Sequence, residues 1–311
     1  MLLGIDIGGT NLVAAKVRDD GMILNKIGIP VDRSWTAEEL CEQIAFLACK
    51  AAGNDKEITS VGIGFPGLVD HSAGVVVQTP NMPFRNTKFR ELFQKYWDIP
   101  VFMGNDANCA AIGEYWAGAA KGCDTVMMIT LGTGIGGGFI VNGKLLTGHF
   151  GGAMEVGHMV IEPNGIPCGC GNRGCFEQYG SATALIRMAK AEMETDGSSA
   201  MWTLCGGELR NVQGITVFQA AKTDDAAAKR VLDQYISGLA VGIANLINIL
   251  QPEMICLGGG IGCADEELLY EPLRKKVGQL VYDKHAPIPI TRAKLGNDAG
   301  IIGAAMLCNM I

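Results

Sequence analysis

The chain has 311 residues, of which 48% are hydrophobic and 18% are charged, and its formal net charge is −7. This length predicts a globular protein with two lobes, and an acidic balance without any basic run excludes a nucleic-acid-binding surface. Every apolar run is shorter than the roughly 18 residues that a membrane span needs. Residues 1–7 read as a strand and not as a signal peptide. We therefore expect a cytoplasmic protein that binds neither membrane nor nucleic acid.

The first segment of the chain predicts two strands joined by a glycine turn. Residues 2–7 form one strand and residues from Asn11 to 17 return as the next. Between them, Gly8, Gly9 and Thr10 would point backbone N–H groups and a hydroxyl into one concavity, as a phosphate-binding turn does. Asp6, at the end of its strand, is placed to hold Mg²⁺ through water. An ordinary hairpin with a buried aspartate is the alternative.

A single asparagine stands out in the next part of the chain. Residues 36–52 follow a helical period and residues 61–65 form a strand. A loop then presents Asn81 between Pro80 and Pro83. Because prolines fix the backbone, the Asn81 amide could bind a hydroxyl group, although plain turn chemistry explains the same pattern.

A strand-to-helix junction supplies a candidate general base. Residues 101–103 form a short strand, Asn105 and Asp106 follow it, and a helix is expected over residues 107–118. Sites of α/β proteins usually lie at the carboxyl ends of strands, which favours Asp106 as the base. The alternative is that Asp106 only caps the helix.

A second glycine turn repeats the first arrangement. Strands over residues 126–131 and 139–141 flank it, and its phosphate-binding residues would be Gly132, Thr133 and Gly134. The turn matches the G-x-G-x-x-G pattern, but a dinucleotide site would require a helix after it, and a strand follows instead. Two such units predict two similar lobes, each giving a phosphate-binding turn to one cleft.

A metal site is predicted by the segment 158–177, which reads HMVIEPNGIPCGCGNRGCFE. One imidazole and three thiolates suit a closed tetrahedral zinc site. The predicted ligands are His158, Cys168, Cys170 and Cys175. The turns around the metal would come from Gly169, Gly171 and Gly174. A chance cluster of cysteines is the alternative. Glu155 and Glu177 flank the cluster, so zinc would hold these carboxylates in place.

The remaining elements alternate between helices and strands. Helices are expected over residues 182–195, 216–222, 225–250, 265–280 and 300–310, and strands over residues 253–257 and 288–291. Gly258, Gly259 and Gly260 follow the first of these strands. Glycines at that position allow the backbone to approach adenine and ribose closely.

With these pieces in order, the chain resembles the ROK family (repressors, open-reading-frame proteins and sugar kinases) of the actin/hexokinase-like ATPases. The resemblance covers essentially the whole chain. The motifs that carry it are DIGGTN at 6–11, GFPG at 64–67, PN at 80–81, ND at 105–106, LGTGIGGG at 131–138, GAMEVGH at 152–158, CGCGNRGCFEQYGS at 168–181 and LGGG at 257–260.

The resemblance implies an ATP-dependent hexose kinase of carbohydrate metabolism and glycolysis. It assigns Asp106 as the catalytic base, Asp6 as the residue near Mg²⁺, and a structural role to zinc. The implied sugar-binding positions are Asn81, Asn105, Asp106, Glu155, His158 and Glu177. The implied nucleotide-binding positions are Asp6, Gly8, Gly9, Thr10, Asn11, Gly132, Thr133, Gly134, Gly258, Gly259 and Gly260. One imidazole nitrogen of His158 could bind zinc while the other donates to a sugar hydroxyl.

The implied fold is α/β, a two-lobed, duplicated ribonuclease-H-like architecture with a cleft between the lobes. We expect a small lobe over residues 1–116 and 298–311 and a large lobe over residues 117–297. Family resemblance also implies a homo-oligomer, either a dimer or a tetramer.

The CFEQYGS run favours glucose as the substrate over fructose, allose, N-acetylmannosamine or N-acetylglucosamine. A sugar-responsive repressor is disfavoured because only five residues precede Asp6, which leaves no room for a winged-helix domain. A catalytically silent sugar sensor is disfavoured because Asp106 and both phosphate turns are present.

Overall fold

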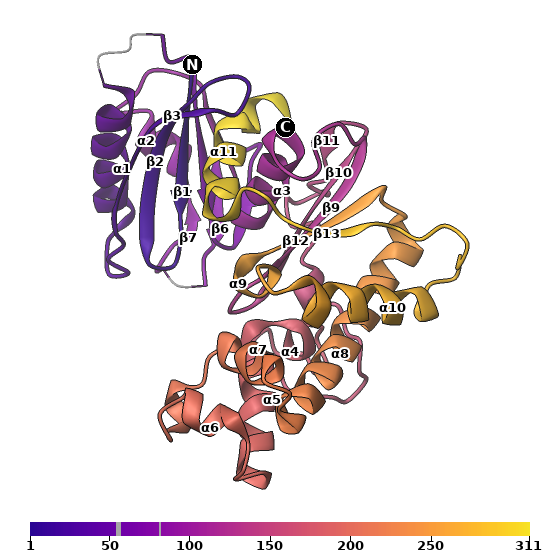
Figure 1. Cartoon of the computed structure of the whole chain (residues 1–311). Helices are drawn as coiled ribbons and strands as arrows, with labels where there is room; N and C mark the ends of the chain where they lie inside the picture. Colours follow the sequence, from indigo (N-terminus) through magenta and orange to yellow (C-terminus); the bar gives the residue numbers. More distant parts are fainter. Residues whose placement is uncertain (54–56, 81) are drawn as a thin grey trace. The chain divides into compact units, whose positions relative to one another are not determined.

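The computed structural model describes residues 1–53, 57–80 and 82–311. The fold is α/β and divides into two compact units (Figure 1). The first unit comprises Met1–Met128, Gly137–Met154 and Ala293–Ile311, and the second comprises Ile129–Gly136 and Glu155–Arg292. The two lobes predicted from the sequence remain a prediction. They differ from these compact units in where residues 117–128, 137–154 and 293–297 are placed.

The first sheet has the strand order β3-β2-β1-β4-β8. Its strands are β1 (Leu2–Ile7), β2 (Asn11–Val17), β3 (Ile23–Pro30), β4 (Ser60–Phe65) and β8 (Val101–Asn105). The first three form an antiparallel meander, whereas β1, β4 and β8 run parallel. The carboxyl ends of the parallel strands therefore meet at one edge. A small antiparallel sheet of β5 (Leu68–Asp70), β6 (Val75–Gln78) and β7 (Arg85–Thr87) accompanies it.

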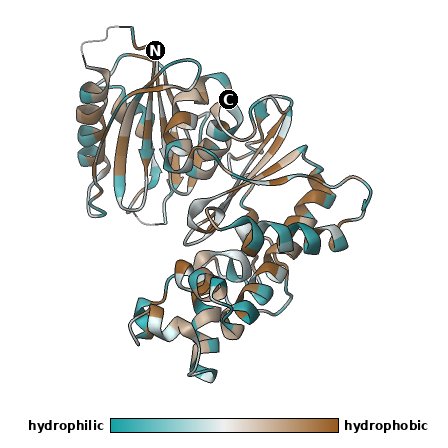
Figure 2. Ribbon diagram, viewed as in Figure 1, coloured by the Kyte–Doolittle hydropathy of each residue, from teal (hydrophilic) through white to brown (hydrophobic). Residues whose placement is uncertain are grey.

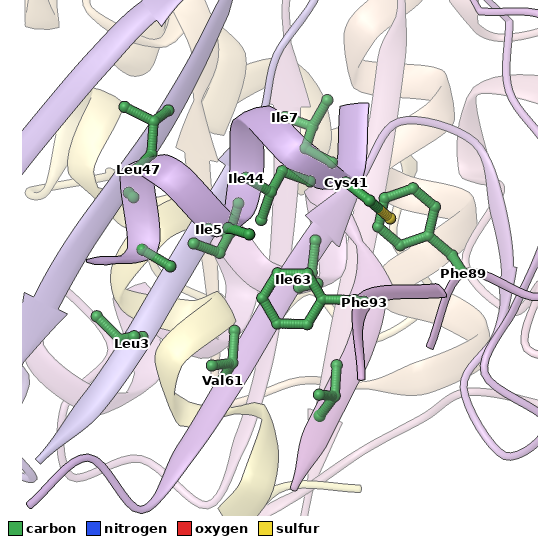
Figure 3. Close-up of a cluster of buried hydrophobic side chains, with 14 of the residues drawn as sticks. Leu3, Ile5, Ile7, Cys41, Ile44, Leu47, Val61, Ile63, Phe89 and Phe93 are labelled. Atoms are coloured by element: carbon green, nitrogen blue, oxygen red, sulfur yellow. The ribbon is translucent and has the colours of Figure 1, made fainter. Parts of the chain in front are cut away.

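Alternation along β1 sends its odd-numbered residues into a hydrophobic core (Figure 3). Leu3, Ile5 and Ile7 are fully buried there. The core is covered by α1 (Ala37–Ala52) and α2 (Phe89–Phe93), which contribute Cys41, Ile44, Leu47, Phe89 and Phe93. Thr36 and Glu39 start α1 with a capping box, which satisfies the first N–H groups of the helix.

Glycines on the opposite face of the sheet allow helices to lie directly on the strands. A Cβ at Gly4 would lie 2.1 Å from the carbonyl oxygen of Ile301, and a Cβ at Gly62 would lie 1.7 Å from that of Ala304. Both carbonyls belong to α11 (Ala299–Met306), which packs with α3 (Asp106–Ala117) on this face (Figure 1). The even-numbered positions of β1, including Asp6, therefore face α11 and α3.

The second sheet repeats the order of the first, as β11-β10-β9-β12-β13. Its strands are β9 (Thr125–Leu131), β10 (Ile135–Val141), β11 (Lys144–Leu145), β12 (Met254–Gly258) and β13 (Ile290–Arg292). Strands β10 and β11 are antiparallel, and β12 and β13 are parallel. The predicted repetition of strand, glycine turn and strand is thus present in both sheets.

Most of the second unit is helical. Its helices are α4 (Glu177–Gly180), α5 (Ala182–Thr195), α6 (Ala200–Leu204), α7 (Gly214–Lys222), α8 (Ala226–Leu250), α9 (Gly259–Gly262) and α10 (Glu271–Leu280). Shorter helical turns lie at Val156–His158, Leu209–Asn211, Glu266–Tyr270, Gly296–Asp298 and Leu307–Asn309. Hydrophobic residues concentrate on the strands, while α10 is largely hydrophilic (Figure 2). Within the described ranges, no helix combines the length and apolar character that crossing a membrane requires.

Candidate active site

Two aspartates lie close together at the carboxyl ends of the parallel strands of the first unit. Asp6 is near the end of β1, and Asp106 directly follows β8. Burial and, as the second cause, the Asp106 carboxylate raise the pKa of Asp6 to about 6 from its ordinary value of 3.8. A Cβ at Gly300 would lie 3.0 Å from Asp6 Oδ2, so this carboxylate also faces the first turn of α11. Two carboxylates that oppose each other's ionisation suit a divalent cation, because hard oxygen ligands are those that Mg²⁺ prefers.

Asn105, and not Asp106, is the N-cap of α3. Asn105 Oδ1 accepts hydrogen bonds from the backbone N–H groups of Ala107 at 2.8 Å and Asn108 at 3.1 Å. Asn105 Nδ2 donates to the carbonyl oxygen of Gly67 at 3.0 Å. Asp106 is the first residue of the helix, and its Oδ1 accepts from the N–H of Ala107 at 2.8 Å. The helix cap is therefore Asn105 and not Asp106. Among the described residues, Gly67 uses one N–H of the Asn105 amide, and the other N–H could donate to a ligand.

The first glycine turn is closed by its own backbone. The N–H of Gly8 donates to the carbonyl of Asn11 at 2.9 Å, and Asn11 Nδ2 donates to Thr10 Oγ1 at 3.2 Å. Gly9, Thr10 and Asn11 are exposed. Their N–H and hydroxyl groups are therefore accessible to an anionic ligand.

Arg33 is a residue at this turn that the sequence analysis missed. Its Nε and Nη2 donate to the carbonyl of Gly9 at 3.2 and 3.1 Å. A guanidinium has five donors, so three remain for a phosphate beside the turn. The sequence offers no local signal for this contact, because nothing links Arg33 to a glycine 24 positions earlier.

The second glycine turn lies in the second unit and is fixed by the helices that follow it. The N–H of Gly132 donates to the carbonyl of Gly134 at 3.0 Å, and the N–H of Ala182 donates to the carbonyl of Gly132 at 2.8 Å. Thr183 Oγ1 donates to the carbonyl of Thr133 at 2.7 Å. Thr133 itself is exposed, so the hydroxyl of a firmly held turn remains accessible.

The glycines after β12 adjoin the strand that carries this second turn. Gly259 has a φ of +76°, and a Cβ on it would lie 2.5 Å from the carbonyl oxygen of Leu131. Leu131 ends β9 immediately before Gly132. Two neighbouring strand ends of one unit therefore carry the segment Gly258–Gly260 and the turn Gly132–Gly134. This arrangement would let the first contact the nucleoside of a nucleotide while the second contacts its phosphates.

Glu177 contacts the second glycine turn directly. Its Oε2 accepts a hydrogen bond from the N–H of Ile135 at 3.0 Å. A Cβ at Gly134 would lie 2.2 Å from the same oxygen, so a larger residue there would displace the Glu177 carboxylate. Glu177 is the first residue of α4 and comes two positions after Cys175. Glu177, which is predicted to bind sugar, thus also holds the predicted phosphate-binding turn in place through this hydrogen bond.

The four predicted zinc ligands converge. The ligand atoms of His158, Cys168, Cys170 and Cys175 all lie within 4.8 Å of one another. His158 Nδ1 is 3.7 Å from Cys168 Sγ, and Cys170 Sγ is 3.6 Å from Cys175 Sγ. Tetrahedral zinc with Zn–S bonds of about 2.3 Å and Zn–N bonds of about 2.0 Å places its ligand atoms about 3.5–3.8 Å apart. The donor set and its spacing therefore fit zinc.

Two of the ligand thiols have pKa values shifted in opposite directions. Burial, followed by the neighbouring thiols, raises the pKa of Cys175 to about 12. A hydrogen bond from the backbone N–H of Asn172 lowers the pKa of the exposed Cys170. A thiol that coordinates a metal ion is deprotonated outright, so zinc would offset the raised pKa of Cys175.

Two of the three glycines expected to wrap the metal adopt the left-handed backbone. Gly171 has a φ of +94° and Gly174 a φ of +74°. A Cβ at Gly174 would lie 1.7 Å from the carbonyl oxygen of Glu162. Gly169 is not among the glycines with a positive φ, but it lies in the turn that the N–H of Gly171 closes on the carbonyl of Cys168 at 3.0 Å.

Glu155 follows a strained residue. Met154 has a φ of +69°, which is unfavourable for a long side chain. The carbonyl of Glu155 accepts from the N–H of His158 at 3.0 Å, which closes the turn Val156–His158. Glu155 is exposed, and this short turn fixes its position relative to the zinc ligand.

The predicted site residues fall into two groups. The first unit contains Asp6, Gly8, Gly9, Thr10, Asn11, Asn105 and Asp106. The second unit contains Gly132, Thr133, Gly134, Glu155, His158, Glu177, Gly258, Gly259 and Gly260. Asn81, which was expected to bind sugar, lies outside the residues that the structure describes.

Residues 2–310 match the sequence profile of the ROK family. The chain belongs to the ROK family. A protein named glucokinase from Thermotoga maritima is 37% identical over 308 residues, which cover 98% of this chain and 96% of that protein. A solved ROK glucokinase from Streptomyces griseus, in complex with glucose and AMPPNP, is 35% identical with a TM-score of 0.84 and covers 98% of both chains.

ROK relatives also include regulators. A protein named xylose repressor from Caldicellulosiruptor bescii is 32% identical over 260 residues, which cover 82% of this chain and 63% of the repressor. The likeness to glucokinases extends over more of both chains than this one does.

Proposed function

We propose that this ROK protein is an ATP-dependent glucokinase that converts glucose to glucose 6-phosphate. The observation that carries the proposal is the position of Asp106 at a strand end beside Asp6, in a chain similar along 98% of its length to a glucokinase solved with glucose and AMPPNP. We assign the duplicated, actin/hexokinase-like fold to the protein together with this function. The repeated strand order of the two five-stranded sheets supports this fold.

Asp106 acts as the general base in this proposal. Its carboxylate accepts the proton of the glucose 6-hydroxyl while the oxygen forms a bond to the γ-phosphorus of ATP. The bond from that phosphorus to the β,γ-bridging oxygen breaks, ADP leaves, and Asp106 later releases the proton to solvent. General base catalysis of this kind contributes typically about 10²–10⁴-fold to the rate.

Backbone N–H groups hold the phosphates. Gly8–Asn11 and Gly132–Gly134 supply donors and two threonine hydroxyls, and Gly258–Gly260 accept the nucleoside. Asp6 holds Mg²⁺, which when bound neutralises phosphate charge. Positioning and charge stabilisation are most of what phosphoryl transfer requires.

Acceptors and donors for the sugar hydroxyls come from Asn81, Asn105, Glu155, His158 and Glu177. Because Nδ1 of His158 faces the thiols, Nε2–H is the group that would donate to a sugar hydroxyl. His158, Cys168, Cys170 and Cys175 would hold zinc in a structural role. Ligation would fix the tautomer of His158 and the positions of the flanking glutamates.

A kinase for another hexose, such as N-acetylmannosamine, N-acetylglucosamine, allose or fructose, is the alternative substrate assignment. A sugar-responsive regulator is less favoured because the glucokinase likeness covers more of both chains. The deciding experiment measures ADP release by the purified protein over a panel of these hexoses. Activity on N-acetylmannosamine without activity on glucose would refute the choice of glucose, and no ADP release with any hexose would refute the kinase. The homo-oligomer implied by the family stays a prediction.

A further inference from the structure

A cavity of about 530 Å³ opens at the amino ends of the first sheet, within the first unit. This volume falls in the range of roughly 300–1,000 Å³ that small-molecule sites occupy. Residues that line it include Leu2, Asp19, Ser60, Phe102, Trp116 and Asn309. Leu2 and Asp6 are four positions apart on β1, so the cavity lies about 13 Å along the strand from the proposed catalytic end.

The register of the sheet places this cavity beside the end of α11. Gly4 pairs with Gly62, and α11 lies on both glycines. Leu2 pairs with Ser60 one row nearer the amino ends, on the same face of the sheet. The α-helix ends at Met306, and the helical turn Leu307–Asn309 that follows it contacts β4 and β8. Cys308 and Asn309 of this turn line the cavity.

Trp116 forms one wall in a fixed orientation. Its indole N–H donates to the backbone carbonyl of Asp19 at 2.8 Å, so the polar edge of the ring is used. Trp116 and Phe102 are both partly exposed. They therefore offer aromatic carbon to the cavity, which suits a ligand that has an apolar face.

The polar lining is neutral apart from one carboxylate. Thr59, Ser60 and Asn309 supply hydroxyl and amide groups, and Asp19 supplies the carboxylate. Lysine, arginine and histidine are absent from the described lining residues. A phosphate or nucleotide would find no counter-charge here, whereas hydroxyl groups would find both donors and acceptors.

Ser60 has an unmet need for a hydrogen bond. Only 5% of the residue is exposed, and among the described residues its Oγ has no hydrogen-bond partner. A buried hydroxyl without a partner destabilises the protein, because it has lost its hydrogen bonds to water and formed none within the protein. Because Ser60 lines the cavity, a ligand there is the group that could supply the missing hydrogen bond.

We propose that this cavity is a second ligand site, separate from the phosphoryl-transfer site, and that it binds a neutral, hydroxyl-rich small molecule of the saccharide class. The aromatic wall packs against the apolar face of the sugar ring, while Ser60, Asn309 and Asp19 hydrogen-bond its hydroxyls. The proposal stands independently of the kinase activity.

The test follows the ¹⁵N indole resonance of Trp116, assigned with Trp116→Phe, during titration of the full chain. The probes are maltose and trehalose as saccharides, choline as an organic cation and inorganic phosphate as an anion. Trp116 and Asp106 lie on the same helix, α3, so Ser60→Ala serves to separate binding in the cavity from an effect transmitted along that helix. We expect saturable shifts with a saccharide, and weakening by at least about fivefold in Ser60→Ala, as loss of one hydrogen bond predicts.

Asp19→Asn separates a hydroxyl ligand from a cation. A neutral saccharide should still bind this variant within about threefold, because an amide oxygen also accepts hydrogen bonds. Shifts with choline or phosphate but not with saccharides would overturn the proposed ligand class. Absence of any shift, or equal saccharide binding by Ser60→Ala, would overturn the site.

Discussion

Glu177 Oε2 accepts a hydrogen bond from the backbone N–H of Ile135 at 3.0 Å. This bond joins the end of the zinc-ligand segment to the glycine turn that is proposed to hold phosphate. In the proposed enzyme one carboxylate therefore serves both substrates, one oxygen through the turn and the other through a sugar hydroxyl.

Glu177→Ala should consequently weaken the use of both substrates. Hydrogen bonds to charged groups contribute roughly 1.5–3 kcal/mol, so we expect the KM of glucose and that of ATP each to rise about tenfold or more. Glu177→Gln keeps an oxygen that can accept from Ile135, and it should restore the KM of ATP while the KM of glucose stays raised. Steady-state kinetics with each substrate varied in turn would measure this. An effect on glucose alone would show that the contact with the turn is not functional.

Asp106→Asn should abolish most of the turnover without unfolding the site. Loss of a general base lowers kcat by about 10²–10⁴-fold. Because Asn105 is the helix cap, the melting temperature should stay near that of the wild type, and calorimetry should still detect glucose binding. Asp98→Asn, at an exposed carboxylate of the same unit, is the matched control. Near-normal turnover by Asp106→Asn would remove Asp106 as the base.

Asp6 should make the protein less stable as pH rises. The unfolded state releases this proton near pH 3.8, whereas the folded state holds it until about pH 6. The folded state binds more protons over this window, so the free energy of unfolding falls with rising pH by about 3 kcal/mol from this group. Asp6→Asn should remove that fall in chemical denaturation measured from pH 4 to 7 without nucleotide or Mg²⁺, and Asp98→Asn should retain it. The same pH slope in Asp6→Asn and wild type would contradict the assignment.

Local pattern was sufficient for the strongly periodic elements of this chain. The helix expected over residues 182–195 is α5 (Ala182–Thr195), and the helix expected over 225–250 is α8 (Ala226–Leu250). The zinc ligands were also predictable, because their spacing lies within one short segment. By contrast, β3 (Ile23–Pro30) was missed, since this strand has no buried residue and is defined by its pairing with β2.

Contacts between residues far apart in the chain could not be predicted from the sequence. Asn105 and Asp106 are both good helix caps, and only the backbone geometry decides that Asn105 takes this role. Glu177 reaches Ile135 across 42 positions, and Arg33 reaches Gly9 across 24. No periodicity or motif encodes such contacts; they depend on which strand ends and loops the fold brings together.

Zinc removal should disorder a limited part of the chain. Cys170→Ser removes an exposed ligand, and Cys49→Ser, at an exposed cysteine on α1, is the matched control. We expect metal analysis to find zinc in wild type and in Cys49→Ser but not in Cys170→Ser. Structural zinc is worth about 10 kcal/mol in small peptides, but the sheets here have cores of their own.

The damage should therefore be local. Hydrogen exchange in Cys170→Ser should accelerate over residues 155–181, and the KM of glucose should rise more than that of ATP. If metal analysis finds no zinc in the purified wild-type protein, the structural role of zinc is refuted.

Arg33 should contribute to nucleotide binding. Its guanidinium donates two hydrogen bonds to the Gly9 carbonyl, which fixes the first glycine turn and places positive charge beside it. Arg33→Ala should raise the KM of ATP by about tenfold, because hydrogen bonds from a charged group contribute roughly 1.5–3 kcal/mol. Arg33→Lys should restore little, since an ammonium lacks the planar fork that contacts one carbonyl twice. Arg85→Ala, at an exposed arginine of the same unit, should behave as wild type. An unchanged KM of ATP in Arg33→Ala would mean that this arginine supports only the loop that carries it.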